Sequence, residues 1–279
     1  MGRNILVTGS HRSGSTWTGN VIAKAQKVRY VHEPFNIGIK RTNSPLSHWF
    51  ECIMSGSSVH EKEVKQYLDS FTSIFHLGNF KRIVNSKSKD EISGLYRDFK
   101  GILTANRILI KDPIAIMSAE WINENYDVDV VVLIRHPAAF IASLKMKNWE
   151  FDFNNYLDQP LLMDRYLKNY SKIIKEYTHK KRDIIDQGIL LWNTIHEVIL
   201  YYKKIYKENW YFVKHENLSL DPIDEFKKMF SHLDLNFDVK TEKYLIETTT
   251  SKDNSSLKRN SRTNIETWKN RLNKEEIIR

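Results

Sequence analysis

A glycine-spaced turn near the N-terminus constrains the fold of this chain more than any other feature. Residues 9–16 read Gly-Ser-His-Arg-Ser-Gly-Ser-Thr, which keeps the G-x-x-x-x-G-[K]-[ST] spacing of a phosphate-binding loop. Ser15 stands where a nucleotide triphosphatase carries lysine, and Arg12 supplies a cation inside the loop instead. The backbone N–H groups of such a loop cradle any oxyanion, whereas the lysine and magnesium serve β/γ-phosphate chemistry. The loop therefore predicts an anion site and argues against ordinary ATP hydrolysis.

The residues on either side of the loop supply the structure that the motif requires. Residues 4–8 form a short apolar run, typical of a buried parallel strand, and residues 17–25 read as a helix. Strand, loop and helix in this order place an anion at the helix N-terminus, where free N–H groups and the macrodipole attract it. The alternative is a Gly/Ser-rich turn with no ligand.

Five short apolar or β-branched runs predict the strands, at residues 4–8, 29–32, 107–110, 128–134 and 210–214. Helical stretches at residues 118–125, 138–147 and about 164–207 lie between them. We therefore predict one α/β domain over residues 1–279, with a mostly five-stranded parallel sheet of the P-loop nucleotide-binding type and helices on both faces. Residues 36–106 read as a mostly helical insertion on the acceptor side; a purely structural cap is the alternative.

The amino-acid composition limits which partners and which kind of protein we expect. Lys and Arg total 43 against 34 Asp and Glu, and the formal charge of +9 favours anionic partners. No nucleic-acid recognition motif is present, so we expect no nucleic-acid partner. The chain has no run of 18 apolar residues and enters its first strand almost at once. We expect a cytoplasmic or membrane-peripheral enzyme with no transmembrane segment and no signal peptide. The chain ends inside a predicted helix at residues 275–279, as a fragment would.

The cysteine and histidine content argues against a metal enzyme. Cys52 is the one cysteine, which excludes an internal disulfide and a cysteine-cluster metal site. The ten histidines are scattered, and no His/Asp/Glu spacing demands a metal. We expect no metal cofactor.

A second cation follows the fourth predicted strand. Residues 128–134 resemble the strand that ends in the magnesium-holding aspartate of a P-loop nucleotidase, but here Arg135-His136-Pro137 follows. An arginine at this place favours a phosphate over Mg²⁺. Ser143, in the helix that starts after Pro137, has a hydroxyl for the same phosphate; an arginine with a structural role is the alternative. Two anion sites on one sheet fit a nucleotide with two separate anionic groups, such as adenosine 3′-phosphate 5′-phosphosulfate (PAPS).

Four segments together resemble the PAPS-dependent sulfotransferases, and they run in family order from residue 5 to residue 272. The loop through Trp17 resembles the 5′-phosphosulfate loop, and Ile134-Arg-His-Pro137 with Ser143 resembles the 3′-phosphate motif. His215-Glu-Asn-Leu218 with Asp221-Pro222 resembles the stretch after the last core strand. Trp268-Lys269-Asn-Arg-Leu272 resembles a Trp-Lys-x-x-Leu segment that covers the nucleotide.

The resemblance implies a role for each matching residue. The 5′-phosphosulfate would be held by Arg12, Ser13, Gly14, Ser15, Thr16 and Trp17, and the 3′-phosphate by Arg135 and Ser143. Lys258, Arg259, Trp268 and Lys269, within a covering segment at residues 255–279, would close over the nucleotide. The family's cytosolic small-molecule members carry lysine in place of Arg12 and a glycine-rich tail that this chain lacks. Both departures point toward the carbohydrate-type and bacterial branches.

A general base must take the acceptor proton, and three residues are candidates. Val31-His32-Glu33-Pro34-Phe35 follows the second strand, and strand alternation predicts that His32 and Glu33 point to opposite sides. Pro34 predicts an extended Glu33. Glu-Pro-Phe resembles the catalytic glutamate segment of carbohydrate-type sulfotransferases, so Glu33 is the favoured base, ahead of His32 and His11.

Lys111, after the third strand, would neutralise the leaving phosphate or orient Glu33; a purely structural ion pair is the alternative for both residues. We therefore predict a sulfotransferase that moves a sulfuryl group from PAPS to a hydroxyl of a carbohydrate or glycoconjugate. The product is adenosine 3′,5′-bisphosphate. A P-loop nucleotide kinase or NTPase and a non-catalytic nucleotide-binding module are the alternatives.

Overall fold

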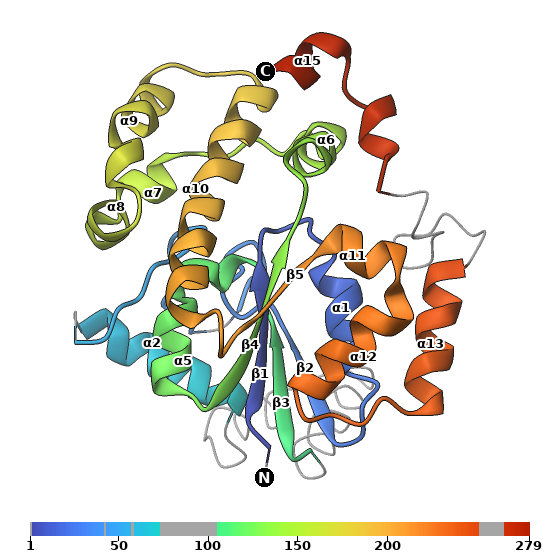
Figure 1. Ribbon diagram of the computed structural model, residues 1–279. Coiled ribbons are helices and arrows are strands. Elements are labelled where there is room, and N and C mark those ends of the chain that lie inside the picture. The colour runs from blue at the N-terminus through green and yellow to red at the C-terminus, as the bar shows by residue number, and fades with distance from the viewer. Residues whose placement is uncertain (1, 42, 57–58, 73–104, 251–264) are drawn as a thin grey trace, which may run out of the picture.

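The fold is an α/β sandwich around one parallel sheet. The computed structural model describes residues 2–41, 43–56, 59–72, 105–250 and 265–279. The strands are β1 (Asn4–Gly9), β2 (Val28–His32), β3 (Arg107–Lys111), β4 (Val128–Ile134) and β5 (Tyr211–Lys214). All neighbouring strands are parallel, in the order β2-β3-β1-β4-β5 (Figure 1). The predicted fold class and the five predicted strands are confirmed.

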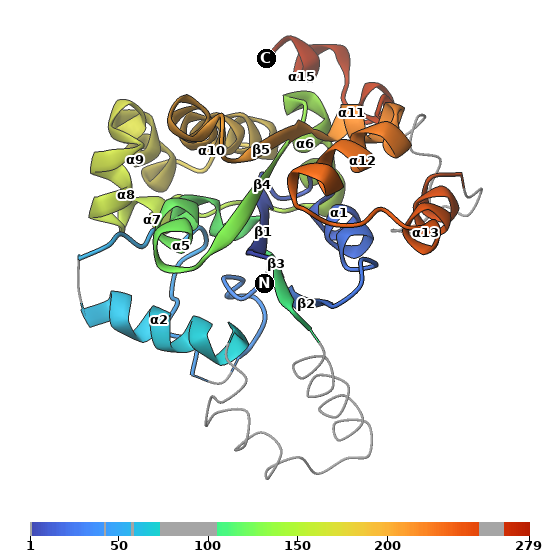
Figure 2. The same cartoon turned by 60° about the horizontal axis from the view of Figure 1, so that its bottom comes forward.

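Strand alternation separates the core into two layers. Ile5 and Val7 of β1 pack on the face covered by α1 (Ser15–Ile22), α11 (His215–Leu220), α12 (Pro222–His232) and α13 (Val239–Thr250). Leu6 of β1 packs on the opposite face. That face is covered by α2 (Val59–Thr72), η1 (Ile114–Ser118), α5 (Ala119–Asn125), α6 (Pro137–Lys147) and α10 (Ile184–Tyr206). Figure 2 shows these two sets of helices on either side of the strands.

A group of short helices extends the second layer. It contains α7 (Asn154–Leu157), α8 (Pro160–Arg165), η2 (Lys168–Tyr170) and α9 (Ser171–His179). The 23-residue α10 then begins after its N-cap residue Asp183, whose carboxylate accepts hydrogen bonds from the backbone N–H groups of Ile185 and Asp186, both at 2.9 Å. Among the described helices, none is long and apolar enough to cross a bilayer.

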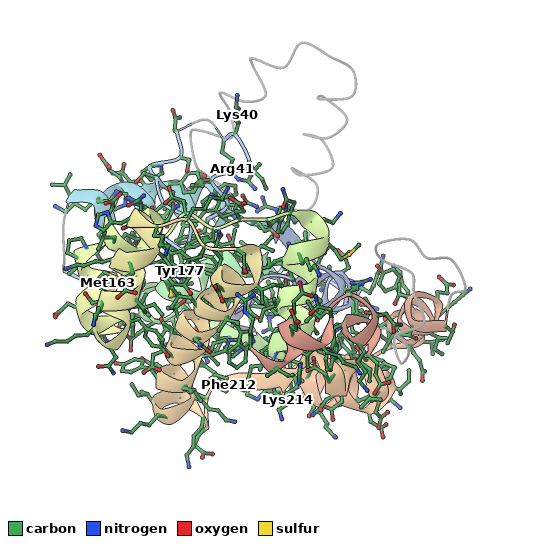
Figure 3. All side chains as sticks on the ribbon, turned by 90° about the horizontal axis from the view of Figure 1, so that it is seen from above. Lys40, Arg41, Met163, Tyr177, Phe212 and Lys214 are labelled. Carbon is green, nitrogen blue, oxygen red and sulfur yellow. The ribbon has the colours of Figure 1, made fainter. Side chains whose placement is uncertain are left out.

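The segments predicted as insertion and C-terminal cover are described in part. Residues 36–41 and 43–56 form turns and extended stretches, and α2 follows them. Near the C-terminus, η3 (Thr267–Asn270) and α15 (Lys274–Ile278) lie beside α6 (Figure 1). Seen from above, Lys40 and Arg41 beyond β2 mark one edge of the sheet and Phe212 and Lys214 of β5 the other (Figure 3). The carboxyl ends of the strands, where such sheets bind ligands, open between these edges.

Candidate functional site

The loop between β1 and α1 has a backbone that its two glycines permit. Gly9 has a φ of +127°, and a Cβ there would lie 2.2 Å from the carbonyl oxygen of Leu133 on β4. Gly14 has a φ of +85°, and a Cβ there would lie 2.6 Å from Nδ1 of His215. Both positions exclude a side chain on grounds of conformation and of space. The loop is therefore held close against β4 and α11 as the motif requires.

The start of α1 is prepared for an anion. Gly14, the N-cap residue, offers no side-chain cap, and the first turn carries no acidic residue. The hydroxyls of Ser10 and Ser13 are buried and have no hydrogen-bond partner among the described residues. Both side chains are fully buried beneath the loop. The N-terminus of α1 suits a sulfate- or phosphate-like group, because its backbone N–H groups attract an anion.

Arg12, Arg135 and Ser143 meet at the ends of β1 and β4. The guanidinium of Arg12 donates from Nε to Oγ of Ser143, 2.9 Å away on α6. The nearly buried guanidinium of Arg135 donates to the backbone carbonyl of Arg12. We expected Ser143 to share a ligand with Arg135, whereas its hydrogen bond in the structure joins it to Arg12. Arg12, Arg135 and Ser143 all line one cavity, so the two predicted anion sites are neighbouring parts of it.

That cavity has a volume of about 1260 Å³ and joins the predicted residues to several others. Most loop residues line it, with Arg135 and Ser143 beyond them. Ser13 lies beneath the wall, fully buried. Polar side chains outside the predicted set also line it, among them Asn36, Ser219, Thr248 and Arg271. They come from the segment after β2, from α11, from α13 and from the C-terminal segment.

Glu33 lines the same cavity, and its backbone corrects one prediction. Its φ is +43°, in the left-handed region, so Pro34 does not hold it extended. The Glu33 N–H donates to the carbonyl of Lys111 at 2.9 Å, and the Glu33 carbonyl accepts from the N–H of Asn36 at 3.2 Å. These bonds turn the chain directly after β2. The direction of the Glu33 side chain is therefore set by this turn and not by strand alternation.

Two neighbours hold the Glu33 carboxylate. Oε1 forms an ion pair with Nζ of Lys111, and Oε2 accepts from Nδ2 of Asn36 at 2.5 Å. Burial disfavours the charged carboxylate, but the hydrogen bond and charge of Lys111, with smaller contributions from Asn36 and His32, outweigh it. The pKa of Glu33 is therefore lowered from its usual value. Glu33 is ionised at neutral pH and faces the cavity with 15% of its side chain exposed.

Lys111 lies behind Glu33 and not on the cavity wall. It is fully buried, and its stem packs where a Cβ on Gly19 of α1 would lie, 2.9 Å from Cγ. The next residue, Asp112, accepts from the N–H of Phe35 at 2.5 Å and fixes the far side of the turn. Lys111 therefore contacts the cavity only through Glu33.

The two histidine candidates occupy different surroundings. His32 is half exposed beside Tyr30 and lies outside the cavity lining, although its Nε2 is 3.9 Å from Glu33 Oε2. Burial and then the charge of Lys111 lower the pKa of His32. His11 lines the cavity, and its ring packs 4.9 Å from Phe140. Burial and then the charge of Arg12 lower the pKa of His11 to about 3, so this ring is neutral at physiological pH.

The predicted covering residues differ in position. Trp17 lines the cavity and donates from Nε1 to Oγ1 of Thr248 at 3.1 Å. The ring of Trp268 stacks on His136 at 5.3 Å, next to Arg135. Lys269 pairs with Glu266 at 2.7 Å and is absent from the lining, whereas Arg271 belongs to it. Lys258 and Arg259 lie outside the described residues.

Within the described part of the chain, no group of three or more His, Cys, Asp or Glu side chains is placed to hold a metal ion.

The chain matches a known protein family and a solved structure. A family model described as the sulfotransferase family matches residues 4–239. The sulfotransferase domain from the curacin biosynthetic pathway superposes with a TM-score of 0.52 at 14% identity, covering 98% of this chain and 93% of that domain. This likeness shows a shared fold.

Two curated proteins from Staphylococcus aureus, each named an uncharacterized HTH-type transcriptional regulator, are 25% identical over 206 residues. That match covers 72% of this chain and 24% of each relative. The chain thus spans about a quarter of the length of the curated relatives it matches.

Proposed function

The chain belongs to the sulfotransferase family, and from that premise we propose that it moves a sulfuryl group from PAPS to a hydroxyl of a carbohydrate or glycoconjugate. The observation that carries the proposal is the convergence of Arg12, Arg135 and Glu33 on one cavity at the carboxyl ends of the strands. Cations for two anionic groups and a carboxylate for a proton are the parts that this reaction needs.

The residues of the loop fit the donor. The N-terminus of α1 suits the 5′-phosphosulfate, together with the lining residues Arg12, Gly14, Ser15, Thr16 and Trp17, and Ser13 supports the loop from beneath. Arg135 and Ser143 suit the 3′-phosphate, since arginine matches phosphate geometry. Trp268 on His136 and Arg271 in the cavity wall provide cover for the nucleotide; Lys269 and Arg259 complete the proposed covering segment.

The transfer requires positioning and charge stabilisation more than covalent help from the protein. The acceptor oxygen attacks sulfur in line and forms the new S–O bond. The bond from sulfur to the 5′-phosphate breaks, and its electron pair leaves with adenosine 3′,5′-bisphosphate. Arg12 stabilises the charge on the transferring oxygens. The acceptor proton passes to the carboxylate of Glu33.

Lys111 acts through Glu33 as a positioning residue. Its ammonium is fully buried and pairs with Glu33 Oε1, which keeps the carboxylate ionised and aimed at the cavity. A lowered pKa reduces the driving force for proton transfer. The ion pair therefore makes Glu33 a weaker base but fixes the position of its carboxylate. We infer that the pair loosens as Glu33 takes the proton.

Nucleotide titration tests the proposal. Adenosine 3′,5′-bisphosphate should bind in EDTA, as measured by calorimetry, and adenosine 5′-phosphate should bind more weakly because it lacks the 3′-phosphate. Arg135→Ala should remove most of that difference, about 1.5–3 kcal/mol for a hydrogen bond to a charged group. Equal affinity of the wild-type protein for both nucleotides would remove the 3′-phosphate assignment. Tighter, magnesium-dependent binding of ATP would favour the kinase alternative.

A further inference from the structure

Aromatic side chains from two distant segments form a wall of the cavity beside the glycine loop. Trp49 and Phe50 come from the segment after β2, and Trp149 and Phe151 follow α6. The rings of Phe50 and Phe151 lie 5.8 Å apart, and the Arg12 guanidinium lies 5.2 Å from the Trp149 ring. Trp149 is 49% exposed, so its ring is available to a ligand. The wall therefore contacts the residue that would hold the transferring group.

The backbone of this wall is strained. Phe50 has a φ of +60°, which is uncommon for a residue with a bulky side chain. Such strain persists where the surroundings fix the conformation, often at ligand sites. The Phe50 side chain is 2% exposed, and its ring also packs 5.6 Å from His11. This conformation presents one edge of the wall to the cavity.

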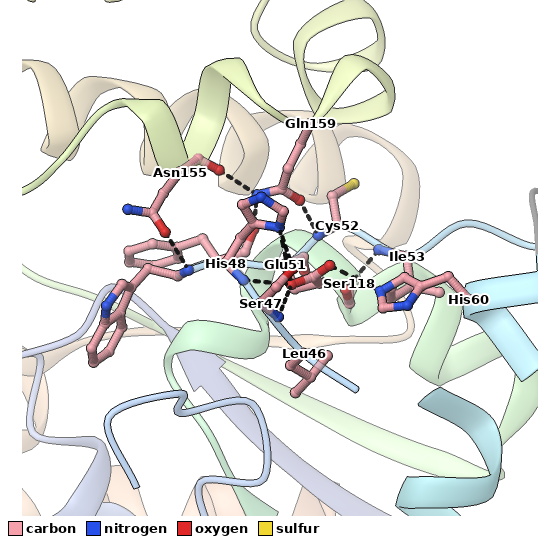
Figure 4. A network of polar contacts seen from close by, with 12 residues as sticks. Leu46, Ser47, His48, Glu51, Cys52, Ile53, His60, Ser118, Asn155 and Gln159 are labelled. Atoms are coloured by element: carbon pink, nitrogen blue, oxygen red, sulfur yellow. Dashed lines mark hydrogen bonds and ion pairs between the residues drawn. The ribbon is translucent and has the colours of Figure 1, made fainter. Parts of the chain in front are cut away.

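Polar side chains next to the wall fix that conformation (Figure 4). Asn155 accepts from the Trp49 N–H at 2.8 Å, and Gln159 accepts from the Cys52 N–H at 2.8 Å. Gln159 also donates to the Phe50 carbonyl at 3.3 Å. The backbone on both sides of Phe50 is thus tied to the α7–α8 region, which follows Trp149 and Phe151 closely in the chain.

Glu51 anchors the same segment from the other side. Its buried carboxylate accepts from the N–H groups of Ser47 at 3.0 Å and His48 at 2.8 Å, and contacts His60 Nε2 at 2.9 Å. Ser118 of η1 donates to the Glu51 carbonyl at 2.6 Å. Hydrogen bonds to a buried carboxylate are among the strong ones in proteins, so this segment is held firmly before any ligand arrives.

The charges in this wall oppose a polyanionic acceptor. Glu150 and Asp152 line it, and Glu150 pairs at 3.0 Å with the exposed Lys181. Among the described residues that line the cavity from 144 to 155, Lys147 alone carries positive charge. A sulfated or uronic-acid chain would need several cations here to offset its own charge.

We propose that this wall selects an uncharged carbohydrate acceptor, whose apolar C–H face lies on the rings of Trp49 and Trp149. The inference rests on the proposed function and narrows its acceptor. An amphipathic ring presents a flat apolar surface to the sugar at low entropic cost, and the lining residues from 144 to 155 lack the cluster of cations that a polyanion would need. Asn155 and Gln159 are positioning residues, because they act on the acceptor through Trp49 and Phe50.

The acceptor test compares three classes of compound with PAPS as donor. A neutral alkyl glycoside should be sulfated, while a glycosaminoglycan chain and a simple phenol should be poor acceptors. Trp49→Ala should raise the KM for the glycoside by about three- to tenfold, in the range of one aromatic contact. Affinity for adenosine 3′,5′-bisphosphate, measured by calorimetry, should stay unchanged in that variant. Leu200→Ala, an exposed apolar residue on α10, is the control and should change neither constant.

Two substitutions at Asn155 test its role as a positioning residue. Asn155→Ala removes the acceptor for the Trp49 N–H and should raise the glycoside KM with little change in kcat. Asn155→Asp keeps an oxygen for the Trp49 N–H but loses the Nδ2 donor to the Asp152 carbonyl, so it should restore part of the KM. Preference for the glycosaminoglycan or the phenol, or an unchanged KM in Trp49→Ala, would overturn the inference. Failure of adenosine 3′,5′-bisphosphate to bind the wild-type protein would instead refute the proposed function itself.

Discussion

Gly14→Ala separates the conformational role of the loop from its steric role. A methyl group at Gly14 would force an L-residue into a φ of +85° and would bring Cβ within 2.6 Å of Nδ1 and 2.9 Å of Cε1 of His215. The left-handed conformation costs about 1–2 kcal/mol, and overpacking at a buried site costs about 1–3 kcal/mol. His215 is 7% exposed, so the ring has little room to move. Gly14→Ala should therefore lower the free energy of unfolding by about 2–5 kcal/mol.

Gly56 provides a matched control. Its φ of +76° is similar, but a Cβ there would meet no atom of the described residues within 4 Å. Gly56→Ala should therefore lose only the conformational contribution, about 1–2 kcal/mol. Both substitutions restrict the unfolded chain in the same way, so that effect cancels between them. The difference between the two variants isolates the contact with His215.

Equilibrium unfolding in urea and calorimetry with adenosine 3′,5′-bisphosphate measure the two consequences. Gly14→Ala should weaken nucleotide binding because the loop must shift away from His215, whereas Gly56→Ala should not. In a His215→Ala background, the stability cost of Gly14→Ala should fall to that of Gly56→Ala. Equal costs for the two single variants, or no relief from His215→Ala, would refute the steric argument.

Three further predictions concern the chemistry of the site. Glu33→Gln should keep nucleotide affinity but lower turnover by about 10²–10⁴-fold in a PAPS transfer assay, whereas His32→Asn should change turnover little; the reverse outcome would make His32 the base. Arg271→Ala should lower the affinity for adenosine 3′,5′-bisphosphate about tenfold, as measured by calorimetry, because one hydrogen bond to a charged group is lost. The KM for the acceptor should not change. Transfer should also survive EDTA, and a requirement for Mg²⁺ would contradict the role assigned to Arg135.

The sheet could be predicted from the sequence because its signal is local. Buried parallel strands are near-continuous apolar runs, and Val128–Ile134 is such a run apart from Asp129. Errors at the other strands amount to one residue: β1 extends to Gly9 and β3 to Lys111. The loop motif likewise lies in consecutive residues, so its conformation follows from the spacing of Gly9 and Gly14.

The cavity wall was harder to predict because it depends on contacts between distant elements. Thr248 on α13 reaches the cavity beside Trp17, 231 positions earlier in the chain. Arg271 lines the cavity, although the sequence favoured the neighbouring Lys269. The turn at Glu33 is a conflict of the same kind: the local preference before Pro34 was outweighed by hydrogen bonds to Lys111 and Asn36. Such outcomes are decided by tertiary structure and carry no local sequence signal.

The ion pair between Glu33 and Lys111 determines how stability and activity should depend on pH. The folded pKa of Glu33 is lowered, so the pair stabilises the fold above the pKa of the unfolded glutamate, about 4.3, and this contribution is lost as pH falls through the folded value. The acidic limb of kcat/KM should accordingly lie below about pH 4.3, if the protein stays folded there. In Lys111→Met, burial of the carboxylate is opposed only by the weaker effects of Asn36 and His32, so the pKa of Glu33 rises.

Lys111→Met should therefore move the acidic limb of kcat/KM to higher pH, and Asn36→Ala should move it the same way by less, because it removes one weaker hydrogen bond. Loss of one partner from a buried pair also costs about 3–5 kcal/mol of stability, so Asn36→Ala is the variant to rely on if Lys111→Met does not fold. Lys228→Met, which removes a surface pair with Glu225, is the control and should leave the profile in place. If the acidic limb of kcat/KM stays at the wild-type pH in both Asn36→Ala and Lys111→Met, Glu33 is not the group whose ionisation limits the reaction.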